Sequence, residues 1–210
     1  MRVPSLHLIV DLSWSPRRVE DAVLAGVDVV QLRDKGAAAA DLFRMARTLK
    51  AITERHRALL FVNDRIDVAL AAEADGVHLA RKSLPPDAAR RVAGDLILGM
   101  SVHERSEVER YSPLVDYVTF GSVFPTATHP EARPKEVEGL REAVRASKAP
   151  VLAIGGIAPE NVAMVLAAGA KGVVVISAIR SAGEDVVLAT VRLRRALDEA
   201  AARLGLTHSL

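Results

Sequence analysis

The segment that decides the fold reads VLAIGGIAPENV and runs from Val151 to Val162. Four apolar residues lead into a glycine pair, Gly155 and Gly156, and a helix-like pattern begins after the proline, acid and asparagine that follow. A short apolar run bounded by glycine is typical of a strand that is covered on both faces, as parallel strands under helices are. The segment therefore predicts a buried strand that ends on bare backbone just before a helix.

Apolar runs of the same kind recur along the whole chain, and segments with the i, i+3, i+4 spacing of amphipathic helices lie between them. They cover residues 7–10, 27–33, 58–63, 76–80, 96–102, 116–123, 150–156 and 172–179. This alternation predicts right-handed strand–helix–strand units and favours one (β/α)8 barrel domain over residues 1–210. The rival open sheet would carry a GxGxxG or GxxxxGK[ST] phosphate loop, and the sequence has neither.

The composition narrows the class of protein. Hydrophobic residues make up 50% of the 210 but aromatic residues only 3%, which predicts a core of Val, Leu, Ile and Ala. The 28 basic and 26 acidic side chains nearly balance, and no basic run is interleaved with aromatics, so we expect no nucleic-acid partner. Without cysteine there is no disulfide and no thiolate metal site. No apolar run is long enough for a signal peptide or a membrane span, which predicts a cytoplasmic protein.

The glycine pair also predicts an anion site. In (β/α)8 barrels, phosphate groups often bind in the loops after the seventh and eighth strands, where Gly155, Gly156 and Ser177 lie in this sequence. Glycine lets an anion approach the backbone, and the N–H groups at the start of the next helix favour negative charge. A plain tight turn is the alternative for a lone glycine pair. Because both loops lie at one end of the barrel, we predict phosphate binding.

Polar side chains follow the second and third predicted strands as well. Gln31, Arg33 and Lys35 alternate at the end of the second, which places them on one face. Asn63 and Asp64 end the third, where such residues suit either a Mg²⁺ ligand or the N-cap of the following helix. The spacing leaves both interpretations open.

Histidine and hydroxyl side chains follow the next three strands. His78 and His103 are each, taken alone, more typical of structural hydrogen bonding than of catalysis. Residues 121–134 read GSVFPTATHPEARP, without helical periodicity, and predict a long active-site loop. In it Thr126, Thr128 and His129 offer donors suited to a diphosphate.

The motifs VQLRDK, FVNDRIDVALAAEADGVHL, GMSVH, DYVTFGSVFPTATH, VLAIGGIAPENV and GVVVISAI, in this order, resemble the thiamine-phosphate synthase/TenI family. The likeness covers about residues 27–179 and implies a (β/α)8 barrel of thiamin biosynthesis with phosphorylated pyrimidine and thiazole substrates. In the synthase branch, hydroxymethylpyrimidine diphosphate and a thiazole phosphate give thiamine phosphate and diphosphate. Mg²⁺ and cationic side chains there stabilise the departing charge.

The resemblance also implies roles for single residues. Asp64 would bind Mg²⁺, and Ser101 would lie near the reacting centre, with His103 and His129 as further catalytic candidates. The substrates would be held by Gln31, Arg33, Lys35 and Asn63 on the pyrimidine side, by Thr126 and Thr128 from the long loop, and by Gly155, Gly156, Ile176 and Ser177 at the thiazole phosphate.

Two positions depart from the synthase pattern. Ser83 stands where the family has its second metal-binding aspartate, and His129 replaces the lysine that ends the loop. Serine cannot supply the missing negative charge, which makes the Mg²⁺ expectation doubtful, and His129 is at most partly charged near neutral pH. One hypothesis is that Arg81 or Lys82 neutralises the diphosphate directly.

Two alternatives to the synthase stay open. The TenI branch resembles a thiazole tautomerase, which needs neither diphosphate nor metal, but its pattern has a catalytic histidine where this chain has Ser122. His103 or His129 would then have to move the proton. The other alternative is a non-catalytic protein that binds a thiazole phosphate as a sensor or carrier. The retained pyrimidine-side residues favour the synthase, and a homo-oligomer is compatible with the sequence.

Overall fold

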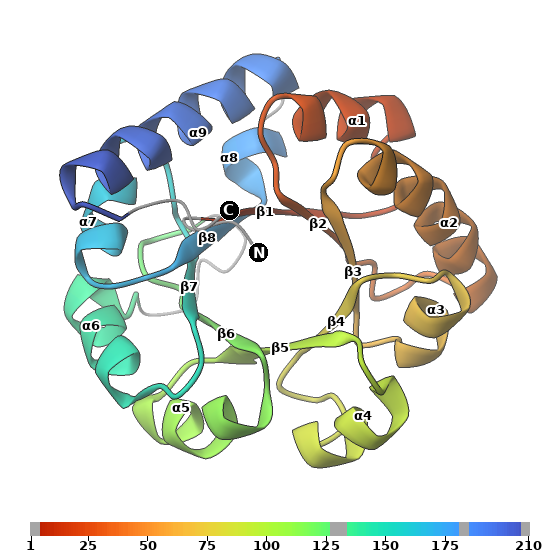
Figure 1. Ribbon diagram of the computed structural model, residues 1–210, viewed down its shortest axis with the longest axis horizontal. Coiled ribbons are helices and arrows are strands. Elements are labelled where there is room, and N and C mark those ends of the chain that lie inside the picture. The colour runs from red at the N-terminus through yellow and green to blue at the C-terminus, as the bar shows by residue number, and fades with distance from the viewer. Residues whose placement is uncertain (1–4, 127–133, 181–184, 207–210) are drawn as a thin grey trace.

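The computed structural model describes residues 5–126, 134–180 and 185–206. They form a closed barrel of eight parallel strands with helices around the outside, as Figure 1 shows in a view down the barrel. The strands follow one another around the barrel in chain order, and β8 pairs with β1 to close it. The predicted (β/α)8 architecture is therefore confirmed.

Short strands alternate with helices along the chain. The strands are β1 (Ser5–Val10), β2 (Val29–Leu32), β3 (Leu59–Asn63), β4 (Gly76–Leu79), β5 (Ile97–Val102), β6 (Tyr117–Phe120), β7 (Val151–Ile154) and β8 (Gly172–Val175). The helices are α1 (Pro16–Leu24), α2 (Ala39–Arg55), α3 (Ile66–Ala71), α4 (Pro86–Ala93), α5 (Arg105–Tyr111), the 3-10 helix η1 (Ser112–Leu114), α6 (Glu136–Ala146), α7 (Val162–Ala167), α8 (Ser177–Arg180) and α9 (Val186–Arg203).

Several strands end earlier than the apolar runs predict. The run over 172–179 gives only a strand to Val175, and Ser177 begins the short helix α8. The pairing of β8 with β1 ends at Leu8↔Val175, so later residues have no ladder to join. Ile179 is nevertheless buried, because the short helix α8 packs on the core. An apolar pattern alone does not separate such a buried helix residue from a strand residue.

The core lies in two layers. Alternation along β1 sends Leu6, Leu8 and Val10 outward into the large cluster between strands and helices. Inside the barrel a smaller cluster contains Ile9, Val29, Phe61, Tyr117, Leu152 and Val174. The predicted aliphatic core is right for most positions, but Trp14, Phe61 and Tyr117 are also among the largest fully buried side chains. Among the described helices, none is long and apolar enough to cross a bilayer.

Candidate active site

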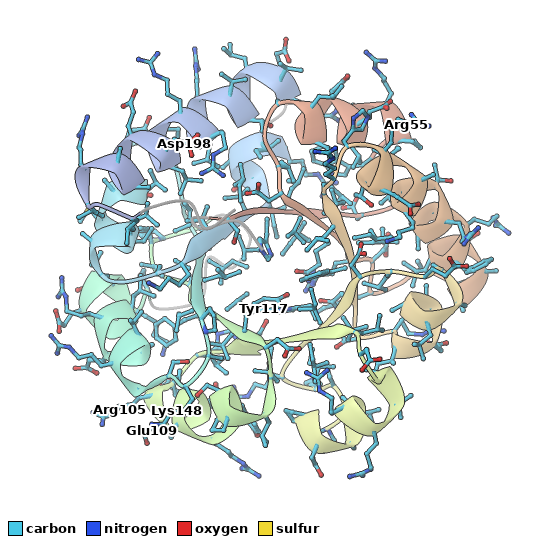
Figure 2. The ribbon with its side chains drawn as sticks, in the orientation of Figure 1. Arg55, Arg105, Glu109, Tyr117, Lys148 and Asp198 are labelled. Atoms are coloured by element: carbon cyan, nitrogen blue, oxygen red, sulfur yellow. The ribbon has the colours of Figure 1, made fainter. Side chains whose placement is uncertain are left out.

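All strands are parallel, so the loops that follow them gather at one end of the barrel, the mouth. This places the loops after β7 and β8 at the same end as the loops after β2 and β3. The barrel below the mouth is filled by side chains, and Figure 2 shows Tyr117 directed into it. A ligand is therefore expected at the mouth and not deeper in the barrel.

A buried amide pair links β2 to β3. The Nε2 atom of Gln31 donates to Oδ1 of Asn63 at 3.1 Å, and Nδ2 of Asn63 donates to Oδ2 of Asp64 at 2.9 Å. Gln31 lies within β2, whereas Arg33 and Lys35 follow its end, Arg33 half-buried and Lys35 exposed. The three residues do not all continue one strand face, because β2 ends at Leu32. Gln31 and Asn63 are thus brought together as predicted, with Arg33 and Lys35 on the loop above them.

Asp64 holds the loop that follows β4. Its backbone is left-handed, with φ of 62°, and its Oδ1 accepts the N–H of Ala80 at 3.0 Å and the hydroxyl of Ser83. Helix α3 begins at Ile66 with Arg65 as its N-cap residue and without a side-chain cap. The N-cap interpretation of Asn63 and Asp64 is therefore wrong: both side chains face the neighbouring strand ends instead.

The donor set around Asp64 can be compared with what a magnesium ion requires. The two hydrogen bonds to Oδ1 and the one to Oδ2 use most of the lone pairs of the Asp64 carboxylate. Ser83 supplies only a hydroxyl at the position where the family resemblance implies a second metal-binding carboxylate. Within the described residues, no three His, Asp or Glu side chains gather into a group that could hold a metal. The residues present do not fit the two-carboxylate magnesium site.

His78 lies under the mouth in a hydrogen-bonded group that the sequence interpretation missed. Its Nδ1 and Tyr117 Oη are 2.9 Å apart, and its Nε2 lies 2.8 Å from Ser101 Oγ. Thr119 Oγ1 donates to Ser101 at 3.3 Å. Burial lowers the pKa of His78 to about 4; Asp64 opposes this shift and Arg33 adds to it. A neutral His78 therefore orients Ser101, and the signal that could have shown this is the inward alternation of β4 and β5.

The two buried histidines give the protein a predictable acid sensitivity. Burial and the charge of His78 lower the pKa of His7 to about 3, and both His7 ring nitrogens lack partners among the described residues. Because both folded pKa values lie below the ordinary 6.5, their contribution is complete above about pH 6.5 and falls as the pH drops towards 4 and 3. Between these pKa values, we expect the free energy of unfolding, measured by urea titration, to fall by about 1.4 kcal/mol per pH unit for each histidine. His7→Leu should remove about half of that slope, and an unchanged slope would contradict the assignment.

His103 and Ser122 lie at the mouth beside the loop after β6. The Nδ1 atom of His103 is 2.6 Å from the carbonyl oxygen of Gly121, and its backbone N–H donates to Glu107 at 2.7 Å. Ser122 packs directly on Gly155, where a Cβ would lie 2.5 Å from that of Ser122. Thr126 is the last described residue before the gap at 127–133, and Thr128 and His129 lie outside the described residues.

The glycine pair after β7 has an additional role in packing. Gly155 and Gly156 have φ values of 94° and 64°, and a Cβ on Gly156 would meet Phe124 Cβ at 2.7 Å and the carbonyl oxygen of Pro125. The loop after β6 therefore lies directly on the pair. The backbone N–H groups of both glycines have no acceptor among the described residues. They remain available to an anion.

The next helix begins after an intervening loop, so its predicted stabilisation of an anion at the glycine pair stays a prediction. Helix α7 begins only at Val162, whose N–H donates to the carbonyl of Ala158 at 3.1 Å. Asn161 closes the intervening loop, because Oδ1 accepts the N–H of Ala158 and Nδ2 donates to the carbonyl of Gly156. Asn161 thus holds the start of α7 against Gly156, but the N–H groups of Ala158 and Val162 are already used within the loop. We therefore expect an anion to use the N–H groups of the glycine pair.

The loop after β8 is fixed from the opposite side. Ile176 is half-buried and Ser177 exposed, at the start of α8. At the end of α8 the guanidinium of Arg180 donates to Asp11 at 2.5 Å and to Ser13 Oγ at 2.9 Å, in the loop after β1. These bonds hold the loop after β8, a part of the candidate phosphate site, against the loop after β1.

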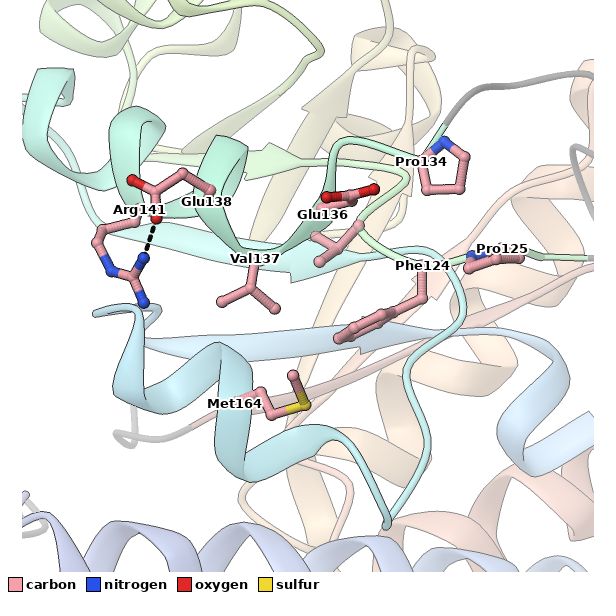
Figure 3. A pocket seen from close by; sticks show the side chains of 9 residues that line it. Phe124, Pro125, Pro134, Glu136, Val137, Glu138, Arg141 and Met164 are labelled. Carbon is pink, nitrogen blue, oxygen red and sulfur yellow. Dashed lines mark hydrogen bonds and ion pairs between the residues drawn. The ribbon is translucent and has the colours of Figure 1, made fainter.

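A groove of about 550 Å³ lies outside the mouth, beside the loop after β6 (Figure 3). Phe124, Pro125, Val137 and Met164 form its apolar lining. None of the candidate site residues lines it, so the groove does not replace the mouth as the candidate site.

With this geometry described, comparison with known proteins decides the family. A family model described as thiamine monophosphate synthase matches residues 6–179. The chain belongs to the thiamine monophosphate synthase family. The thiamine-phosphate synthase of Pyrococcus abyssi is 43% identical over 197 residues, covering 92% of this chain and 95% of that protein. That of Chloroflexus aurantiacus is 40% identical, with 90% of each chain covered.

A solved family structure agrees with the fold. The thiamine phosphate pyrophosphorylase of Pyrococcus furiosus superposes with a TM-score of 0.86 at 40% identity, covering 93% of this chain and 96% of that one. The resemblance inferred from the motifs is thus confirmed at the level of family and fold.

Proposed function

We propose that this chain is a thiamine-phosphate synthase, which joins hydroxymethylpyrimidine diphosphate to a thiazole phosphate and releases diphosphate. Relatives with this name at about 40% identity over most of the chain support the proposal. The observation that carries it is the arrangement of the mouth. Amides and cations lie on the β2–β4 side, the His78–Ser101 pair lies below, and free backbone N–H groups lie on the β7 side.

This arrangement suits two phosphorylated substrates that meet above Ser101. On the β2–β3 side, Gln31 and Asn63 would orient the pyrimidine, and Arg33 and Lys35 would attract its diphosphate. On the other side, the N–H groups of Gly155 and Gly156 would hold the thiazole phosphate, together with Ile176 and Ser177. The two rings are then placed on opposite walls with their reacting atoms between them.

The reaction needs charge stabilisation more than proton transfer. The C–O bond to diphosphate breaks with both electrons leaving on the diphosphate, and the thiazole nitrogen donates its lone pair to the pyrimidine methylene carbon to form the C–N bond. The protein's task is to favour the departing anion and to hold the thiazole nitrogen in line. Neutral His78 fixes the Ser101 hydroxyl beside the reacting carbon without placing another cation there.

The tautomerase remains a second candidate because one observation favours it: the Asp64 carboxylate is occupied by Ser83 and Ala80. Such a reaction uses the thiazole phosphate alone. His103 is the described histidine nearest to the position of the tautomerase base, but its Nδ1 is held by the carbonyl of Gly121. A binding protein without turnover would use the same phosphate loop.

Purified protein incubated with both substrates and with Mg²⁺ supplied separates the three functions. We expect thiamine phosphate and diphosphate in equal amounts, detected by chromatography and by a coupled diphosphate assay. Isomerisation of the thiazole without condensation would replace the synthase by the tautomerase. Calorimetric binding of the thiazole phosphate with neither product would leave only the sensor.

A further inference from the structure

We propose that this chain binds the diphosphate through side-chain cations at its mouth, adding Arg81 and Lys82 to Arg33 and Lys35, and turns over without a bound magnesium ion. The inference rests on the proposed synthase function and names how that site handles its leaving group. It starts from the misfit between the Asp64 surroundings and a metal site.

The Asp64 carboxylate serves as an anchor for a tight turn. The N–H of Ser83 donates to the carbonyl of Ala80 at 3.0 Å, which closes a turn over residues 80–83. Ser83 Oγ accepts the N–H of Ala80 at 2.6 Å and donates to Asp64, whose Oδ1 also accepts that N–H. A carboxylate that satisfies a turn in this way is a structural acceptor, and a metal ion would have to break these bonds to reach Oδ1.

The same turn presents two cations. Arg81 and Lys82 occupy its two central positions, and both side chains are exposed at the mouth. Compared with the Gly-Gln-x-Asp pattern implied by the family resemblance, the turn lacks a carboxylate and carries two positive charges. That reversal would repel a divalent cation and attract a polyphosphate.

Ion pairing shows which cations at the mouth are available. Arg65, Lys135 and Arg180 are held by Asp67, Glu104 and Asp11, respectively. By contrast, no ion-pair partner lies within the described parts of the chain for Arg33, Lys35 or Lys82.

Arg81 has only a loose partner. Its Nε lies 3.6 Å from Glu107, and the Arg81 side chain is 75% exposed. An exposed pair of this kind contributes little, so Arg81 can leave Glu107 for a phosphate. Its guanidinium can then bind two phosphate oxygens at once.

The first test measures metal dependence directly. With enzyme, substrates and excess EDTA, we expect the rate of thiamine phosphate formation to stay within about threefold of the rate with Mg²⁺. Condensation that occurs with Mg²⁺ and stops in EDTA would overturn the inference while leaving the synthase function intact. Absence of condensation under both conditions would instead remove the synthase function, and the binding test below then decides the cation site by itself.

The second test measures binding of inorganic diphosphate by calorimetry in EDTA. The double variant Arg81→Ala/Lys82→Ala should weaken binding about 30-fold, and added salt should weaken binding to the unsubstituted protein. The matched control is Arg145→Ala/Lys148→Ala, which removes the same charges at the end of α6 and just beyond it, towards the opposite end of the barrel. No binding in EDTA, or equal loss in both double variants, would contradict the cation site.

Two substitutions in the turn complete the test. Asp64→Asn keeps an acceptor for Ala80 and Ser83 but turns its own amide towards that of Asn63, so it should lower condensation equally with Mg²⁺ and in EDTA. A loss seen only with Mg²⁺ would indicate a metal ligand. Ser83→Asp should create Mn²⁺ binding, visible by electron paramagnetic resonance, that the unsubstituted chain lacks. Equal Mn²⁺ binding by both would overturn the inference.

Discussion

Gly156→Ala should raise the KM for the thiazole phosphate by about 10- to 100-fold, the loss expected when a hydrogen bond to a charged group is removed. Gly156 has φ of 64°, and a Cβ there would meet Phe124 Cβ at 2.7 Å and the carbonyl oxygen of Pro125. The backbone must therefore rotate or the loop after β6 must lift. Either change turns the free N–H groups away from the phosphate. Steady-state kinetics with varied thiazole phosphate measure the effect.

Gly205→Ala is the matched control for this substitution. Gly205 has nearly the same φ, 65°, but nothing lies within 4 Å of a Cβ built on it, after helix α9. Alanine at position 205 therefore destabilises the protein by the same amount for its left-handed backbone, about 1 kcal/mol, but it causes no clash and lies away from the mouth. We expect unchanged kinetics for Gly205→Ala. If Gly156→Ala also keeps its KM, the phosphate does not bind at this loop.

The fold was predictable because barrel strands carry a strong pattern. Each strand is covered on both faces, so it appears as a short apolar run, and eight such runs with helices between them leave few architectures. The strand ends were less predictable. Val123, in a loop, and Ile179, in helix α8, are buried residues whose apolar character extends the runs beyond the sheet. The spacing of apolar residues along the chain does not show where the neighbouring strand, and with it the pairing, ends.

That the candidate residues lie close together at the ends of the strands was predictable, but their contacts were not. Gln31 and Asn63 lie on the adjacent strands β2 and β3, and the structure brings Nε2 of Gln31 to 3.1 Å from Oδ1 of Asn63. The Asp64–Ser83 bond joins residues on two loops, and nothing in their spacing indicates it. His78 appeared structural when taken alone, but its partner Ser101 lies 23 positions away, on the next strand. Hydrogen bonds between loops depend on register and side-chain direction, which a single sequence does not contain.

A substitution inside the barrel should have the largest effect on stability. Gly99 on β5 lies opposite Tyr117 on β6, and a Cβ at Gly99 would overlap the Tyr117 ring. That ring is fully buried against Phe61 and His7, with centroids 5.8 Å and 5.7 Å away, and its hydroxyl bonds His78. Because the filled interior leaves no space, Gly99→Ala should cost about 3 kcal/mol, the upper end for overpacking. Thermal unfolding should show a Tm about 6–12 °C lower.

Two further variants separate overpacking from a general effect of alanine. Gly139→Ala in helix α6 makes the same chemical change where a Cβ would lie 3.3 Å from Lys135 Cβ, and it should change the free energy of unfolding by no more than about 1 kcal/mol in either direction. Tyr117→Leu alone costs stability because it empties part of the interior. In the Gly99→Ala background, the smaller leucine relieves the overlap, so the two losses should sum to less than their separate values. Two outcomes would contradict this prediction: strictly additive losses, or a Tm for Gly99→Ala within about 2 °C of that of the unsubstituted protein. Either would show that the Tyr117 ring has room to move and that the barrel interior below the candidate site is not tightly packed.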